Sequence, residues 1–126
     1  MIPIWRWRVL FADLDPTLGS EQAGVRPIVI VSDEDFNQAV NLATVLPLTS
    51  RKPGRRVYPN EVLLEAGVAG LTADSIVLAH QIRTLARQRF RNTIGYLGDV
   101  EKQQQILEAI RGHLGMIRRG GVWLSL

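Results

Sequence analysis

The sequence contains no cysteine among its 126 residues. This absence excludes disulfide bonds, zinc sites with thiolate ligands and a cysteine nucleophile, and it leaves the chain compatible with a reducing compartment. His80 and His113 are the only histidines, and their spacing does not match the HxH or HxxxH patterns of metal-binding histidines. A metal site therefore has little support, and we expect no metal ligands in this chain.

Long apolar runs are also absent, so no segment reaches the length of a membrane-spanning helix. Residues 1–14 alternate tryptophan with arginine instead of forming the apolar centre of a signal peptide. We therefore expect a cytoplasmic protein without a membrane partner. The length suits one domain with its own hydrophobic core, and no repeat or linker interrupts the chain, so residues 1–126 are expected to form that single domain.

Positive charge is in modest excess, but its distribution is uneven. The chain carries 15 Lys and Arg against 12 Asp and Glu, for a net charge of +3. Residues 51–91 hold eight of the basic residues and only three acidic ones. This balance permits a polyanionic partner such as RNA, although a basic segment is more often a solvated surface.

Apolar residues alternate or cluster in several short segments that predict β-strands. Alternation from Trp5 to Leu14 predicts a half-buried strand with Trp5, Trp7 and Phe11 on its core face. The apolar run from Ile28 to Ser32 predicts a strand buried on both faces. Further strands are expected over Ala43 to Leu48, Val57 to Leu64, Ser75 to Ile82 and Arg91 to Leu97.

Two helices are expected as well. A short helix over Asp33 to Asn41 is capped by Asp33 and has an apolar stripe of Phe36, Ala39 and Val40. Asp99 is expected to cap a longer helix. Its apolar residues recur at helical spacing and are Val100, Ile106, Leu107, Ile110 and Leu114.

Short strands with two helices and no regular strand–helix alternation favour a mainly β, α+β fold. We expect a compact, strongly curved antiparallel barrel with a short internal helix and a C-terminal helix. The apolar segment Val122 to Leu126 follows a pair of glycines. It is expected to dock on its own barrel or on another subunit.

A polar loop punctuated by glycine leads to Arg26, immediately before the second strand. Asp15-Pro16 starts a turn, and Gly19 and Gly24 allow the backbone to fold over itself. Guanidinium keeps its charge at any working pH and matches the geometry of phosphate. Arg26 is therefore a candidate for phosphate recognition or transition-state stabilisation. An ion pair with Glu21 that only fixes the loop is equally compatible with the spacing.

Four blocks of residues occur in order and together resemble the MazF/PemK toxin family. They are Asp13 to Pro16 with Gly19 to Gly24, Arg26-Pro27, Pro47 to Ser50, and Gln81 to Thr84. The resemblance extends from Phe11 to Leu114. It implies a dimeric SH3-like barrel that acts as a metal-independent, cofactor-free endoribonuclease and is neutralised by a cognate antitoxin.

The resemblance also implies roles for individual residues. The family's catalytic arginine and threonine fall on Arg26 and Thr49, and its loop glutamate falls on Glu21, either as the base or as a support for Arg26. The residues expected to bind RNA line the same rim and are Ser20, Gln22, Ser50, Arg51, Lys52, Arg56, Gln81 and Arg83. Arg55 belongs to the same cationic turn and would also follow the RNA backbone.

The expected reaction is cleavage of single-stranded RNA by its own 2′-hydroxyl, which leaves a 2′,3′-cyclic phosphate and a 5′-hydroxyl end. The chain departs from the family at Ile4 to Trp7, where a Gly-Asp pair is common, and at Ala86-Arg87, which replaces an acidic–basic pair. Two other functions remain open: a CcdB-like toxin that binds and inhibits a DNA topoisomerase without catalysis, and an RNA-binding member that does not cleave.

Overall fold

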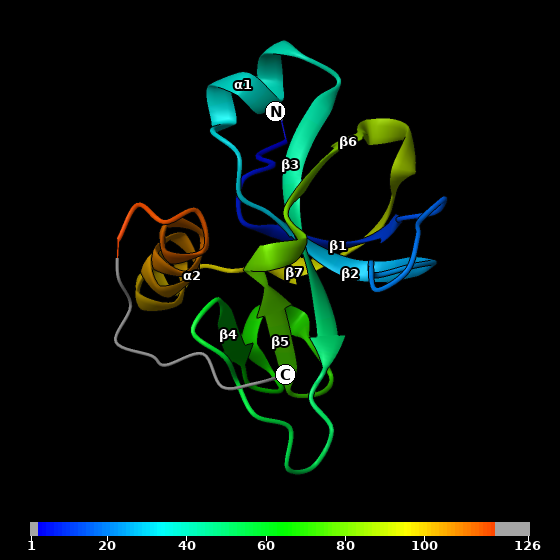
Figure 1. Cartoon of the computed structure of the whole chain (residues 1–126). Coiled ribbons are helices and arrows are strands. Elements are labelled where there is room, and N and C mark those ends of the chain that lie inside the picture. The colour runs from blue at the N-terminus through cyan, green and yellow to red at the C-terminus, as the bar shows by residue number, and fades with distance from the viewer. Residues whose placement is uncertain (1–2, 118–126) are drawn as a thin grey trace.

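Seven antiparallel strands form one strongly curved sheet in the computed structural model, which describes residues 3–117 (Figure 1). The strands are β1 (Arg8–Asp13), β2 (Val25–Ile30), β3 (Leu42–Ser50), β4 (Glu61–Leu64), β5 (Ser75–Leu78), β6 (Arg83–Ala86) and β7 (Phe90–Tyr96). Their order is β4-β5-β3-β2-β1-β7, and β6 pairs with β3 beside this path. The mainly β, α+β prediction is confirmed. Within the described residues the sheet stays open, because β4 and β7 are not paired with each other.

Strand β3 is the longest strand and connects the two halves of the sheet. Its first residues pair with β6, its middle residues with β2, and its last residues with β5. Between β5 and β6 the chain makes a 3-10 turn, η2 (Ala79–Gln81). The predicted continuous strand from Ser75 to Ile82 is therefore wrong beyond Leu78, because η2 interrupts it, and β6 was not predicted.

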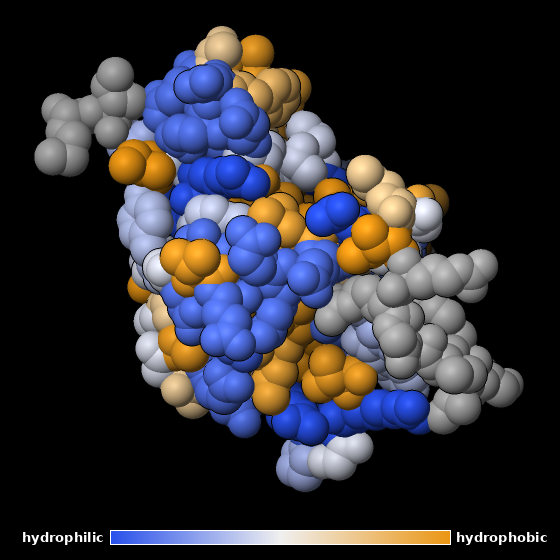
Figure 2. Space-filling view, turned by 90° about the vertical axis from the view of Figure 1, so that its left-hand side faces the viewer, coloured by the Kyte–Doolittle hydropathy of each residue, from blue (hydrophilic) through white to orange (hydrophobic). Residues whose placement is uncertain are grey.

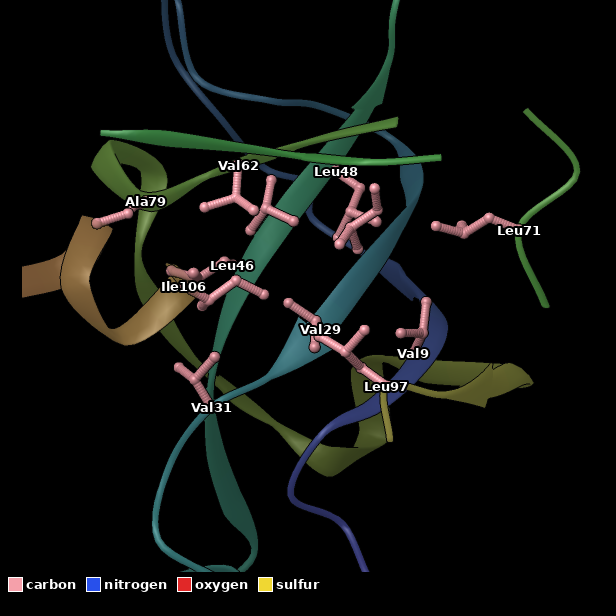
Figure 3. Close-up of a cluster of buried hydrophobic side chains, with 13 residues drawn as sticks. Val9, Val29, Val31, Leu46, Leu48, Val62, Leu71, Ala79, Leu97 and Ile106 are labelled. Atoms are coloured by element: carbon pink, nitrogen blue, oxygen red, sulfur yellow. The ribbon is translucent and has the colours of Figure 1, made fainter. Parts of the chain in front are cut away.

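Hydrophobic residues are buried on both faces of the central strands. Figure 3 shows one cluster, in which Val9, Val29 and Leu46 meet residues of β4, β5 and helix α2 (Val100–His113). A second cluster is built from the alternate residues of β1, β2 and β3 together with Leu85 of β6, and it includes Leu10, Ile28, Ile30 and Val45. This arrangement explains the continuous apolar run in β2, which the sequence correctly indicated.

The aromatic N-terminal segment differs from the prediction. Strand β1 begins only at Arg8, because Trp7 has a φ of 69° and extended alternation cannot continue through a left-handed residue. Trp7 packs against the first cluster and Trp5 against the second. Phe11, expected on the core face, is 38% exposed.

Both helices begin at their predicted N-caps, but not all of the apolar residues predicted to face the core are buried. Helix α1 (Glu34–Ala39) is capped by Asp33, yet its buried residue is Asn37, whereas Phe36 and Val40 are exposed. Helix α2 is capped by Asp99 and buries Ile106 and Ala109 on the sheet. Val100, its first residue, and Leu114, its C-cap, are exposed, contrary to the prediction.

Figure 2 faces the side that carries α2 and shows a mostly hydrophilic surface with scattered hydrophobic side chains. This surface agrees with a helix that buries only one stripe. Strand β4 starts at Glu61 rather than at Val57, because residues 59 and 60 form a turn. No helix of the described part is long and apolar enough to cross a membrane. The predicted docking segment Val122 to Leu126 lies outside the described residues.

Candidate active site

An open pocket of about 580 Å³ lies between the β1–β2 loop and the β4–β5 end of the sheet. Ser20 and Gln22 of the loop and Thr49 of β3 line it. Its remaining lining residues come from β4, β5, the turn before β4 and η2, and are Arg55, Tyr58, Asn60, Glu61, Leu78, His80 and Gln81. A smaller pocket of about 310 Å³ shares Ser20, His80 and Gln81 with it and adds Glu21, Ile82 and Arg83. Six of the eleven predicted site residues therefore line these two adjoining pockets, which together form the groove, whereas Arg26, Arg51, Lys52 and Arg56 are not among the lining residues.

Strand register directs Arg26 to the same face of the sheet as Thr49. Ile28 of β2 pairs with Pro47 of β3. Since residues two apart on a strand share a face, Arg26 and Thr49 both belong to the face of this pair. The β2–β3 pairing itself ends at Ile28 and Pro47, so Arg26 and Thr49 share a face without being paired with each other. Thr49 lines the main pocket, whereas Arg26 is not among its lining residues.

The exposed guanidinium of Arg26 bonds to its own loop through one nitrogen. Its Nε donates to the carbonyl oxygen of Ala23 at 3.0 Å. No ion pair or hydrogen bond within residues 3–117 engages its two terminal nitrogens. Arg26 is thus oriented by the loop while its fork remains available for an anion.

The Glu21 side chain forms a hydrogen bond within its own loop and none with Arg26. Its Oε1 accepts a hydrogen bond from the backbone N–H of Leu18 at 2.6 Å. The described residues contain no ion pair between Glu21 and Arg26, so the loop-fixing pair considered from the sequence is not found. Gly19 and Gly24 have φ values of 57° and 73°, as the predicted turn requires.

Gln81 and Arg83 hold the loop against the sheet. The backbone N–H of Gln22 donates to Gln81 Oε1 at 3.2 Å, and Gln81 Nε2 donates to the carbonyl oxygen of Ser20 at 3.0 Å. Arg83 donates to the carbonyl oxygens of Gln22 and Leu14 at 3.4 and 3.5 Å. The two side chains predicted to bind RNA therefore fix the loop backbone, and both also line the groove.

Ser50 does not join Thr49. Consecutive residues of a strand point to opposite faces, and Ser50 lines a separate pocket of about 200 Å³ with Phe11 and Pro27. The prediction that Ser50 adds a hydroxyl to the site of Thr49 is wrong for this reason.

The cationic turn after β3 is partly committed to contacts within the protein. Arg51 Nε donates to the carbonyl oxygen of Arg55 at 3.1 Å, and the Arg56 guanidinium lies 5.6 Å from the ring centroid of Tyr58. Arg55 forms a two-pronged ion pair with Glu61, with both N–O distances 2.8 Å. Arg55 was expected to follow the RNA backbone, but its guanidinium is held by Glu61 instead. Lys52 is exposed.

The buried carboxylate of Glu61 is the site feature that sequence reasoning missed. Burial alone would raise its pKa, but hydrogen bonds from Arg55 and from the backbone N–H of Tyr58 outweigh burial and hold the pKa below its ordinary value. Glu61 is thus charged at neutral pH, and its pairing with Arg55 fixes the turn that walls the pocket. The only sequence signal was an acidic residue within an apolar run that follows a basic turn.

The site as a whole can stabilise an anion through hydroxyl, amide and guanidinium donors. Among residues 3–117 no three His, Asp or Glu side chains lie together in a way that could hold a metal ion. Thr49 and Ser20 supply hydroxyls, Gln22 an amide and Arg26 a permanent positive charge. Donors of this kind, fixed in a partly enclosed groove, suit the stabilisation of charge that develops on a phosphate.

Comparison with known proteins shows consistent similarity along nearly the whole chain. Residues 5–114 match the model of the PemK-like, MazF-like toxin of type II toxin–antitoxin systems. Endoribonuclease EndoA of Bacillus subtilis is 36% identical over 112 residues, which are 89% of this chain and 95% of that protein. The crystal structure of MazF from Deinococcus radiodurans superposes with a TM-score of 0.75 at 27% identity, covering 92% of this chain and 99% of that one. A MazE–MazF structure from the same organism gives a TM-score of 0.68 at 28% identity, covering 93% and 99%.

Proposed function

The chain belongs to the PemK-like, MazF-like toxin family of type II toxin–antitoxin systems, and we propose that it is an endoribonuclease that cleaves single-stranded messenger RNA without a metal ion. The activity is supported by the relative named an endoribonuclease. The observation that carries the proposal for the site is the pocket in which Thr49 faces the loop residues Ser20 and Gln22, with Arg26 directed to the same sheet face.

In the proposed reaction the ribose 2′-oxygen attacks the adjacent phosphorus, the bond from phosphorus to the 5′-oxygen breaks, and a 2′,3′-cyclic phosphate remains. Arg26 would stabilise the extra negative charge of the five-coordinate phosphate, because a fixed cation in a partly enclosed groove acts more strongly than in water. Thr49 would donate its hydroxyl to a non-bridging oxygen. The departing 5′-oxygen takes a proton and becomes a hydroxyl.

The proton acceptor for the 2′-hydroxyl is assigned to Glu21. Arginine is a poor base because its pKa is above about 12. The Glu21 carboxylate is exposed and lines the groove beside Ser20, and only one of its oxygens is used by Leu18. Its second oxygen is therefore available for proton transfer. We further propose that Ser20, Gln22, Lys52 and Arg56 contact the RNA, as do the parts of Arg51, Gln81 and Arg83 that face the groove.

Partners and location complete the proposal. A cognate antitoxin is supported by the related MazE–MazF structure, and an acidic tail that orders on binding would complement a groove rich in cations. We also propose a homodimer, as the family resemblance implies, and a cytoplasmic location, where messenger RNA is available. The CcdB-like alternative is not supported, because the relatives are named endoribonucleases and none of the findings points to a topoisomerase inhibitor.

The proposal is tested with purified protein and single-stranded RNA in excess EDTA. Cleavage that leaves 2′,3′-cyclic phosphate ends is expected, and Arg26→Ala and Thr49→Ala should each slow it by about 10² or more, the scale of one lost charge-stabilising donor. Near-normal turnover in either variant would remove that residue from the mechanism. RNA binding without cleavage, unchanged in Arg26→Ala, would identify the chain as a non-catalytic RNA-binding member.

A further inference from the structure

One end of the main pocket is formed by side chains that the proposed cleavage chemistry does not use. Thr49 pairs with Ile76, whereas Leu78, two residues further along β5 and on the same face, pairs with Glu61. The pair formed by Leu78 and Glu61 is therefore displaced from Thr49 by about 7 Å along the strands. Asn60 and His80 line the pocket beside Leu78. A phosphate held at Thr49 leaves this end of the pocket for another part of the same RNA.

Asn60 offers a fixed hydrogen-bonding group at this end. The residue is 7% exposed, and its backbone oxygen accepts from the N–H of Ala79 at 3.1 Å. Its side-chain Nδ2 donates to Nδ1 of His113 at 3.3 Å. Its Oδ1 has no hydrogen-bond partner in the described part of the chain. Asn60 therefore presents an acceptor and a second amide hydrogen whose direction is set by the protein.

His80 provides the second group. Its ring lies 6.2 Å from the ring of His113, and no hydrogen bond to its side chain is formed within residues 3–117. The pocket partly removes the His80 ring from water, which lowers its pKa; the negative charge of Glu61 opposes this effect and the positive charge of Arg55 adds to it. At neutral pH the imidazole is thus uncharged and presents one donor and one acceptor.

We propose that this end of the pocket is a specificity subsite that receives one unstacked nucleobase of the RNA, whose edge is read by Asn60 and His80. The inference rests on the proposed function, since it assumes that RNA occupies the groove. A nucleobase combines an apolar face with an edge of donors and acceptors, which matches Leu78 beside an amide and an imidazole. The Glu61 carboxylate and the Arg55 guanidinium cancel in charge, so this end favours a neutral base over a second phosphate.

The subsite is tested by removing the base and the side chain separately and together. A series of oligoribonucleotides carries a single abasic nucleotide at each position around the cleaved bond, and kcat/KM is measured for the wild type, His80→Ala and Asn60→Ala. Asn92→Ala, an exposed residue of β7 outside the pocket, is the control. Urea unfolding shows whether each variant is folded. His80 is exposed, so its variant keeps the test decisive if Asn60→Ala does not fold.

At one position only, base removal should reduce wild-type kcat/KM by at least about three- to tenfold, the scale of one hydrogen bond, and should have a smaller effect in His80→Ala, which keeps only Asn60. The control should keep the wild-type profile. Equal effects of base removal in the wild type and His80→Ala at every position would overturn the subsite while leaving the nuclease proposal intact.

A binding series separates the two proposals. The same oligonucleotides with a 2′-deoxy sugar at the cleaved position lack the nucleophile, so their Kd values report recognition alone. Base discrimination that depends on His80 in binding, without cleavage of the matching RNA, would support the subsite and contradict the nuclease proposal. Failure of the folded wild type to bind RNA would overturn both.

Discussion

Replacing Arg55 by methionine tests whether the ion pair with Glu61 organises the pocket wall. The variant keeps an unbranched side chain at position 55. It leaves the Glu61 side chain, which is 3% exposed, with the Tyr58 N–H as its remaining hydrogen-bond donor. Removing one partner of a buried ion pair costs about 3–5 kcal/mol. Because the Arg55 side chain is 31% exposed, water screens part of this effect, and we expect a loss of about 2–3 kcal/mol at neutral pH.

The stability lost in Arg55→Met should depend on pH, because the variant changes the direction in which the pKa of Glu61 is shifted. In the wild type the folded pKa of Glu61 lies below its ordinary value of 4.5, so its contribution to stability is present above that value and is lost as pH falls through the folded pKa. In Arg55→Met, burial dominates and raises the folded pKa above the unfolded value. The carboxylate then destabilises the fold at neutral pH, and this cost disappears when it is protonated.

The free energy of unfolding is therefore measured by urea titration from pH 7 down to pH 4 for the wild type, Arg55→Met and the matched control Arg56→Met. The difference between wild type and Arg55→Met should narrow as pH falls, and Arg56→Met should differ by less than about 0.5 kcal/mol throughout. A difference that stays constant with pH, or one no larger than that of the control, would refute the assigned role of the ion pair.

Three further predictions concern the loop latch, the two strand faces and a close backbone approach. Gln81→Ala removes both bonds to the loop and should lower kcat/KM about tenfold with a stability loss below about 1 kcal/mol; an unchanged kcat/KM would show that the loop needs no latch. Ser50→Ala should leave RNA cleavage unchanged while Thr49→Ala slows it, and equal losses would contradict their placement on opposite faces. Gly95→Ala would place a Cβ against the backbone oxygen of Ala69, whereas Gly98→Ala meets nothing within 4 Å; thermal unfolding should show a loss of about 2 kcal/mol or more for the first alone.

Local signals in the sequence predicted the segments in which neighbouring residues decide the structure. The cap at Asp99 and the helix after it were correct, because a side-chain acceptor at the N-terminus and helical apolar spacing act within a few residues. The glycines of the loop before Arg26 were correct for the same reason. Ser50 lies on the opposite face from Thr49, as strand alternation requires, and the prediction of one shared rim of hydroxyls at the end of the strand neglects this alternation.

Other features depended on contacts between distant segments and could not be read locally. The left-handed conformation of Trp7 lets the two N-terminal tryptophans pack on different clusters. The strand is interrupted after Leu78 by the turn η2, and no residue type in that apolar run indicates the interruption. The role of Gln81 as a latch depends on a loop about 60 positions earlier in the chain.

The sequence by itself determined the short-strand α+β architecture and, through a resemblance carried by four blocks of residues, the family; it also named Arg26 and Thr49 as candidates for phosphate chemistry. The architecture follows from residue types and short spacings, which fix hydrogen-bonding capacity, charge and local conformation. Only the tertiary structure decided which cations remain available, since Arg55 is committed to Glu61, and which side chains share the pocket. Those outcomes depend on strand register and on burial, because a carboxylate removed from water must find its positive partner wherever the fold brings one within reach.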